Sequence, residues 1–286
     1  PPLRIALRIH EGHSHFGFPA SLEAIRQAIA LIPKNQAATF GLHTHTNPAG
    51  SVTTPEEIAD DFRTRAELLG GLAEQLHEVT FLDLGGGIDS PYVYRLLPSE
   101  LGEFHNPATC ASLRQRHESQ RFSLKDAGHK VSAAVRASLG ANLARWQIQM
   151  EPGRAVCTRA LSTVVEVQAV KDGLYPDATV VITDGNTAIL GPLHRGVHPL
   201  TAQVPGLVES FVYGNLPHSA DWLFQAVDLP PLKVGDRLVI SHTGAYFLAL
   251  EANFGHGRPG IYREISGKMA RAPESSLEPS LRDSGG

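Results

Sequence analysis

The sequence of 286 residues contains only two cysteines, Cys110 and Cys157. Two cysteines are too few for a disulfide framework or a zinc–thiolate centre in a chain of this length, and they are typical of a reducing compartment. The sequence also lacks a run of about 18 apolar residues, as a membrane-spanning helix requires. Its opening, PPLRIALRIHEG, lacks the regions of a secretory signal peptide. We therefore expect a cytoplasmic protein.

Neither sign of charge is in large excess, because 25 Lys and Arg oppose 29 Asp and Glu, for a formal net charge of −4. With 42% hydrophobic and 19% charged residues, the composition is that of an ordinary globular protein. No basic region typical of nucleic-acid binding is present. We expect neither nucleic acid nor a membrane as a partner, and the length predicts one large domain or two modest ones.

The first half of the sequence alternates between strand and helix patterns. Strands are predicted where apolar residues alternate or form short runs, at 3–9, 37–43, 79–84 and 146–150. Amphipathic helices are predicted at 22–32, at 54–77 after a Thr54–Glu57 capping box, and at about 124–144. This order favours parallel βα units, whose functional groups lie at the carboxyl ends of the strands.

From about residue 155 the pattern changes to runs rich in β-branched residues, ALSTVVEVQAV, ATVVITDG and DRLVIS, separated by turn-forming residues. These runs predict a second, mostly β domain. Residues 267–286 are polar and lack periodicity, which predicts a disordered tail.

Three consecutive glycines, Gly85 to Gly87, follow the strand predicted at 79–84 in the motif LDLGGGI. Backbone without side chains can approach an anion closely and present its N–H groups to a phosphate. A tight turn between a strand and a helix explains the glycines equally well. The spacing matches neither the dinucleotide-binding fingerprint nor the P-loop.

The segment EPGR follows the strand predicted at 146–150 and places Glu151 and Arg154 in one turn. A carboxylate can hold a pyridine nitrogen protonated, and a guanidinium suits the recognition of phosphate or carboxylate groups. A structural ion pair at the end of a strand is the alternative.

In GLHTHT, His43 and His45 lie two residues apart and therefore on one face of the strand predicted at 37–43. This pattern is typical of the first ligands of a metal hydrolase, and it also suits one imidazole stacking on an aromatic cofactor. Two polar residues at a strand end without any ligand are the third interpretation.

Six motifs occur in an order that resembles the fold-type III pyridoxal-phosphate-dependent decarboxylases, the diaminopimelate and ornithine decarboxylase group with an alanine racemase-like barrel. They are HSHFGF, GLHTHT, FLDLGGGI, MEPGRAV, ITDGNTAILGPLHRGVHPL and HTGAYFLALEANFGHGRP. The resemblance implies an α/β fold in which residues 1–154 form the C-terminal portion of a (β/α) TIM-type barrel. Residues 155–266 would form the β-rich C-terminal decarboxylase domain, followed by the tail at 267–286.

The resemblance implies pyridoxal 5′-phosphate as cofactor, and it assigns roles to residues that match the family's motifs. His45 would stack on the pyridine ring, Gly85, Gly86 and Gly87 would bind the phosphate, and Glu151 would face the ring nitrogen. Arg154 and Tyr246 would add phosphate contacts. The family's Schiff-base lysine lies upstream of the matched region, so we expect the lysine-bearing part of the barrel to lie outside this chain or in a companion chain.

The segment GNLPHSADWL resembles the family motif G-P-x-C-[ED]-S-x-D, which reaches into the partner's active site across a dimer interface. Pro217 stands at the cysteine position and His218 at the acidic position, whereas Asp221 is retained. The resemblance thus implies a homodimer with shared active sites, in which His45, His218 and Asp221 are the candidate catalytic residues. Replacing a carboxylate by an imidazole argues against a simple diamino acid as substrate, and His218 is a candidate proton donor.

The function expected from the sequence is therefore decarboxylation of a small amino-acid substrate with pyridoxal phosphate. Two other hypotheses stay open. One is a non-catalytic relative of the decarboxylases with a regulatory or binding role, because no lysine in the chain matches the Schiff-base motif. The other is a metal hydrolase that uses His43 and His45, for which no further ligand is evident in the sequence.

Overall fold

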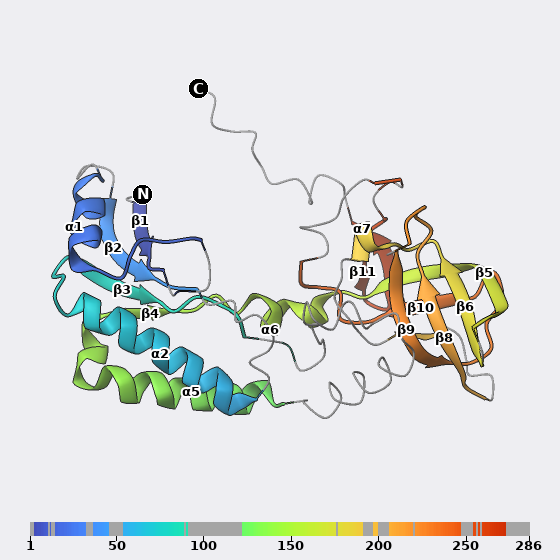
Figure 1. Cartoon of the computed structure of the whole chain (residues 1–286), viewed down its shortest axis with the longest axis horizontal. Helices are drawn as coiled ribbons and strands as arrows, with labels where there is room; N and C mark the ends of the chain where they lie inside the picture. The colour runs from blue at the N-terminus through green and yellow to red at the C-terminus, as the bar shows by residue number, and fades with distance from the viewer. Residues whose placement is uncertain are drawn as a thin grey trace, which may run out of the picture.

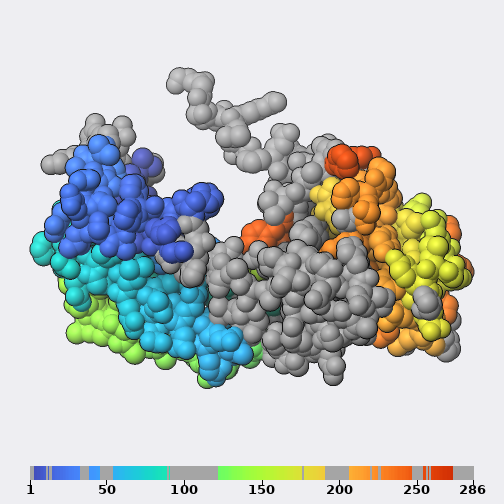
Figure 2. Space-filling view, viewed as in Figure 1, coloured from blue at the N-terminus to red at the C-terminus, as the bar shows by residue number. Residues whose placement is uncertain are grey.

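The computed structural model consists of a βα part followed by a β-rich part (Figure 1). In a space-filling view these two parts occupy opposite ends of the long axis (Figure 2). The structure describes residues 3–10, 12, 15–32, 37–45, 54–88, 90, 122–175, 177–190, 197–199, 206–219, 221–246, 254–255, 257 and 259–272.

The first part is built on a parallel sheet with the strand order β1-β2-β3-β4. Its strands are β1 (Leu3–Arg8), β2 (Ala37–His43), β3 (Val79–Asp83) and β4 (Gln147–Gln149). Each lies within a strand predicted from the sequence, and β2 matches its prediction at both ends. Sequential parallel order is the expected result of βα units, and it brings the carboxyl ends of all these strands to one edge of the sheet.

The helices of this part are α1 (Leu22–Ala30), α2 (Pro55–Ala73) and α5 (Leu124–Leu139). The predicted capping box of α2 is present, since the Thr54 hydroxyl accepts the Glu57 N–H and the Glu57 carboxylate accepts the Thr54 N–H. α2 and α5 lie side by side (Figure 1). Their apolar faces join the strands in one core, which includes Ile25, Leu42, Phe62, Leu69, Leu82, Val131 and Val135.

The helix predicted at 124–144 is divided near its end. α5 stops at Leu139, and a 3-10 helix, η2 (Gly140–Arg145), continues to β4. Gly140 has a φ of 50°, a left-handed conformation that interrupts an α-helix and that glycine adopts at little cost. The position of the glycine therefore explains the shorter helix.

A short connection, α6 (Gly153–Cys157) and η3 (Thr158–Ala160), leads into the second sheet. The sheet has the order β7-β10-β5-β6-β8-β9, in which all neighbouring pairs are antiparallel except β6 and β8. Its elements are β5 (Thr163–Tyr175), β6 (Ala178–Thr183), α7 (Thr187–Leu190), β7 (Val197–Pro199), β8 (Val208–Tyr213), β9 (Trp222–Leu229) and β10 (Arg237–Ile240). A separate apolar core, including Val165, Val181, Val212 and Leu238, stabilises this sheet.

The structure differs from the sequence prediction at the start of the predicted tail. β11 (Tyr262–Ile265) and β12 (Lys268–Arg271) form an antiparallel hairpin, so the first residues of 267–286 are ordered. Ser266 and Gly267 have φ values of 51° and 78°, the left-handed pair that a two-residue hairpin turn requires. The dipeptide Ser-Gly was the local signal for this turn. The rest of the predicted tail, 273–286, lies outside the described residues.

Within the described ranges, no helix combines the length and apolar character needed to cross a membrane.

Candidate functional site

The predicted site residues of the βα part meet where β2, β3 and β4 end. His43, Asp83 and Gln149 are paired across these strands, so the following loops leave the sheet at the same level. Backbone hydrogen bonds then continue past the strands: Thr44 N–H donates to the Asp83 carbonyl at 3.0 Å, and Glu151 N–H donates to the Gly85 carbonyl at 2.9 Å. The loops that carry the histidines, the glycines and Glu151 are therefore held together by their main chains.

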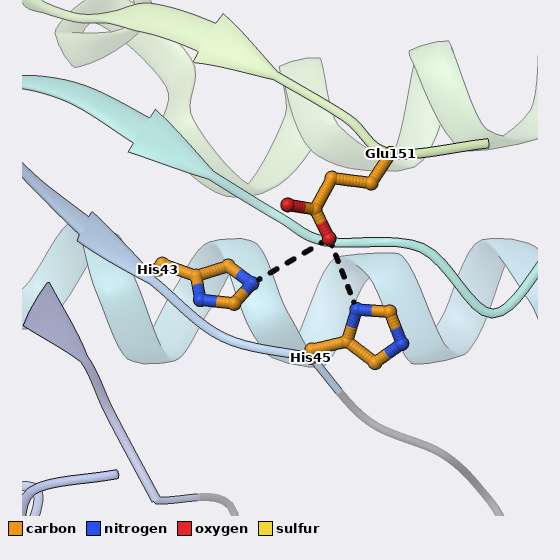
Figure 3. A group of neighbouring side chains, drawn as sticks. All are labelled: His43, His45 and Glu151. Atoms are coloured by element: carbon orange, nitrogen blue, oxygen red, sulfur yellow. Dashed lines mark hydrogen bonds and ion pairs between the residues drawn. The ribbon is translucent and has the colours of Figure 1, made fainter. Parts of the chain in front are cut away.

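The side chains of His43, His45 and Glu151 converge on one point (Figure 3). The Glu151 Oε2 atom lies 3.2 Å from His45 Nδ1 and 3.8 Å from His43 Nε2. The Glu151 side chain is half-exposed, whereas only 17% of the His43 side chain is accessible. A carboxylate with an accessible face and two imidazoles therefore stands at the sheet edge where a ligand can enter.

The two histidines differ in their surroundings. Burial lowers the pKa of His43 below its ordinary value, against the opposing effect of the Asp83 and Glu151 carboxylates, so His43 is neutral at neutral pH. His45 Nδ1 lies 3.2 Å from the Gly86 nitrogen as well as from Glu151. Because one ring nitrogen offers either a lone pair or an N–H, it accepts from Gly86 in one tautomer and donates to Glu151 in the other. The tautomer of His45 therefore decides whether its Nδ1 atom binds the glycine loop or Glu151.

The glycine loop is packed too closely for other residues. A Cβ atom on Gly85 would collide with the Thr44 carbonyl, and one on Gly86 would collide with the Glu151 carbonyl. Gly85 and Gly87 also have φ values of 67° and 88°, in the left-handed region. The sequence left a tight turn and an anion loop equally open. In the structure the glycines form a closely packed loop in which Gly87 is exposed, so the backbone of Gly87 remains accessible to an anion.

Arg154 and Tyr246 approach each other from different parts of the chain. The Arg154 guanidinium carbon lies 5.6 Å from the centroid of the Tyr246 ring. Tyr246 has a φ of 70°, an uncommon conformation for an aromatic residue. Gly244 N–H donates to the Thr158 carbonyl at 3.0 Å, and a Cβ on Gly244 would collide with the Cys157 carbonyl. The segment 243–246 is thus fixed against α6 and η3, next to the turn that bears Glu151.

His218 and Asp221 lie in the loop between β8 and β9 of the second sheet. The buried Asp221 carboxylate accepts hydrogen bonds from Thr187 N–H and Oγ1, both at 2.8 Å, and from Leu216 N–H at 2.7 Å. His218 is exposed, and its N–H donates to the Leu216 carbonyl. These bonds show that Asp221 organises its own loop and joins it to the start of α7. The catalytic roles of both residues stay predictions.

One residue near the site was missed by sequence reasoning. Arg65 is buried on α2, with its guanidinium against the carbonyls of the glycine loop. The signal was present, because an arginine three residues after Phe62 and four before Leu69 interrupts the apolar face of a helix.

Solved structures with the same fold include diaminopimelate decarboxylases. The enzyme from M. jannaschi matches with a TM-score of 0.70 and 18% identity, over 99% of this chain and 64% of that protein. The Helicobacter pylori enzyme, solved with L-lysine, matches with a TM-score of 0.65 and 18% identity, over 96% and 66%. The fold is therefore that of the fold-type III pyridoxal-phosphate proteins, with a partial barrel and a β-rich domain, and the predicted fold class is confirmed.

Residues 88–244 match the family model described as pyridoxal-dependent decarboxylase, C-terminal sheet domain. The chain belongs to this family. Its relatives include the diaminopimelate decarboxylase of Actinosynnema pretiosum subsp. auranticum, 28% identical over 86% of this chain and 51% of that protein. They also include antizyme inhibitor 2 of Xenopus laevis, 23% identical over 89% and 55%. The chain spans about half the length of the curated relatives that it matches.

The cofactor of this family is pyridoxal 5′-phosphate, and the residues present fit it. A ring nitrogen needs a carboxylate, which Glu151 provides with an accessible face. A phosphate needs backbone N–H groups and a cation, for which the exposed Gly87 and the Arg154 guanidinium are suited. The planar ring of His45 lies between Glu151 and the glycine loop. Its Cε1 atom is 3.1 Å from the position that a Cβ on Gly86 would take.

The same edge could also hold a divalent cation when no cofactor is bound. The donor atoms of His43, His45 and Glu151 all lie within 4.8 Å of one another. Two imidazoles and a carboxylate are a common zinc ligand set. Glu151 would supply the third ligand of such a site, a ligand that the sequence did not reveal, and it is also the carboxylate predicted to face the cofactor.

Proposed function

We propose that this chain supplies the cofactor-binding edge of a pyridoxal-phosphate-dependent amino-acid decarboxylase. One observation carries the proposal: Gly86, His45 and Glu151 come from three separate loops and are in mutual contact at the carboxyl edge of a parallel sheet. Membership of the decarboxylase family supports it.

When bound, pyridoxal phosphate accepts the electron pair released as the α-carboxylate of an amino acid leaves as CO₂. Glu151 would keep the ring nitrogen protonated, because a carboxylate close to that nitrogen favours its charged form. His45 would lie against the ring and limit its movement. Arg8 supports this placement, since its Nη2 atom donates to the His45 carbonyl at 2.9 Å.

The glycine loop, Arg154 and Tyr246 would bind the phosphate. A guanidinium binds a phosphate through paired N–H groups, and the backbone of Gly87 would add a donor without a side chain in the way. Contact between Tyr246 and Arg154 would restrict both side chains before the phosphate arrives. The second sheet would thus complete a site that is built mainly by the first.

The substrate would be an amino acid without a simple distal ammonium group. His218 stands where the family motif has an acidic residue, and an imidazole does not attract an ammonium as a carboxylate does. His218 is proposed to reach the partner's site in a homodimer and to donate the proton that replaces the carboxylate. The lysine-bearing part of the barrel would come from outside this chain.

The test has two stages. The chain is first dialysed to equilibrium against pyridoxal phosphate, and saturable binding at one site per chain is expected. The complete product of the gene is then assayed for CO₂ release from carboxyl-labelled amino acids, with diamino, neutral and acidic substrates compared. Release from non-diamino substrates is expected. Absence of cofactor binding would overturn the proposal, and preference for diaminopimelate, ornithine or lysine would overturn the substrate class.

A non-catalytic role is the second candidate, and it is supported by the match to a relative named as an antizyme inhibitor rather than a decarboxylase. Cofactor binding without CO₂ release from any amino acid in the panel would favour it.

A further inference from the structure

Arg65 is a buried cation that the proposed reaction does not yet use. It is 1% exposed and lies on the face of α2 that packs on the sheet. Burying a guanidinium is unfavourable unless its N–H groups are paired, so such residues are uncommon in an apolar core. Replacing it by an apolar residue would remove this cost, and its presence therefore calls for a reason.

Arg65 binds the main chain at the glycine loop and a carboxylate on its own helix. Its Nη1 atom donates to the Leu84 carbonyl at 2.8 Å and to the Gly86 carbonyl at 2.5 Å. Its Nη2 atom pairs with the Asp61 carboxylate one turn earlier on α2, and the Phe62 ring lies 4.4 Å from its guanidinium carbon. The guanidinium is thus oriented by residues of its own helix and binds the loop from the side of the core.

The bond to the Gly86 carbonyl fixes the direction of one N–H group of the loop, that of Gly87. In a planar trans peptide the C=O and N–H point to opposite sides. The carbonyl of Gly86 points toward Arg65 inside the core, so the N–H of the same peptide, which belongs to Gly87, points away from the core. Gly87 is exposed. Arg65 therefore turns a donor outward at the place where a phosphate is expected.

We propose that Arg65 is a positioning residue that holds the Gly85–Gly87 loop in its phosphate-binding form. The inference rests on the proposed function, because the phosphate is that of the cofactor. Arg65 does not touch the phosphate; it acts through the backbone of the loop.

The inference is tested by comparing two ligands that differ only in the phosphate. Dissociation constants of the full chain for pyridoxal phosphate and for pyridoxal are measured by equilibrium dialysis. For Arg65→Met we expect affinity for pyridoxal phosphate to fall by about ten- to a hundredfold, as for loss of charge-assisted hydrogen bonds. Affinity for pyridoxal should change less than about twofold, since no phosphate is present to bind the loop. A general loss of structure would lower both affinities together.

Two further variants make the result decisive. Arg65→Lys keeps the charge and can donate to the same carbonyls, so it should restore part of the preference for the phosphorylated ligand. Arg63→Met removes an exposed arginine from the same helix, where it pairs only with Asp60 and Glu67 among the described residues, and should leave the preference unchanged.

Equal losses for both ligands, or an unchanged preference in Arg65→Met and Arg65→Lys, would overturn the role of Arg65 while leaving the proposed function intact. If the unmodified chain binds neither ligand, the proposed function fails and the inference fails with it.

Discussion

In the parallel sheet, three neighbouring strands end at the same level, and each delivers a site residue within two positions of its last paired residue. In the antiparallel sheet, the residues of interest lie in loops and are placed by side-chain contacts, as Asp221 is by Thr187 and Leu216. The first region positions its candidate site residues through main-chain hydrogen bonds. In the second region the Asp221 side chain organises its surroundings, whereas main-chain hydrogen bonds of Thr243 and Gly244 hold the segment that bears Tyr246.

This difference predicts how the two regions respond to mutation. Substitutions at the edge of the parallel sheet should change cofactor binding, because loops there contact one another through the main chain. Substitutions in the second sheet should change stability first.

Gly86→Ala should have the largest effect on the site. A Cβ at this position meets the backbone carbonyl of Glu151, which cannot rotate away as a side chain can. We expect loss of about 3 kcal/mol of stability and a fall in pyridoxal phosphate affinity of about a hundredfold or more. Urea unfolding and equilibrium dialysis measure the two effects.

Gly128→Ala is the matched control, because nothing lies within 4 Å of a Cβ at that exposed position of α5. It should raise stability by up to about 1 kcal/mol and leave the cofactor affinity unchanged. If both variants bind the cofactor equally well, the glycine loop does not form the site.

Asp221→Ala should destabilise the second sheet by about 2 kcal/mol, since it leaves partly buried donors of Thr187 and Leu216 without their acceptor. Cofactor affinity of the folded protein should stay within about twofold of the unmodified chain. Asp172→Ala, which removes an exposed acceptor of the same sheet, should cost less than about 0.5 kcal/mol. Unchanged stability of Asp221→Ala would show that the second sheet keeps this residue for chemistry instead.

Glu151→Gln should weaken pyridoxal phosphate binding by about tenfold, because the neutral amide cannot stabilise a protonated ring nitrogen. Added Zn²⁺ should compete with the cofactor in the unmodified chain, since His43, His45 and Glu151 would serve either ligand, and should compete less in the variant. Equilibrium dialysis measures both. Glu67→Gln on the exposed face of α2 is the control, and equal affinities for the two variants would contradict the assignment of Glu151.

The smallest effect concerns pH. Burial lowers the pKa of His43 in the folded chain, so the unfolded chain binds a proton more readily, and stability should fall as pH decreases below about 6.5 toward the folded pKa. Above that pH the contribution is fully present. Urea unfolding at about pH 7.5 and 5.5 should show a smaller difference for His43→Gln than for the unmodified chain. An identical pH dependence in both would exclude His43 as its source.

Local patterns predicted most of the first region. The short apolar stretch at 37–43 and the capping box at Thr54 depend on neighbours in the sequence, and the structure reproduces both. The motifs at His45, Gly85–Gly87 and Glu151 lie directly after strands, so knowledge of a parallel sheet was enough to bring them together. The early end of α5 was missed because the prediction did not give Gly140 a left-handed conformation.

The second region was predicted only as β structure. Its strand order, with β10 between β7 and β5 and a parallel pair of β6 and β8, depends on contacts between distant residues that no local pattern encodes. The proximity of Tyr246 to Arg154 and the hydrogen bond from Thr187 to the Asp221 carboxylate have the same origin. Arg65 carried a readable signal, but its meaning required the position of the Gly86 carbonyl.

The contact of Gly244 with Cys157 has a consequence for recombining this chain with its relatives. The segment from Glu151 to Ala160 connects the two sheets along the chain, but it is held in place by contacts with residues 243–246. A chimera spliced at 154/155 would pair one parent's Arg154 with the other parent's Tyr246. A crossover upstream of β4 would instead take residues 151–160 and 243–246 from the same parent, so their contacts would be kept.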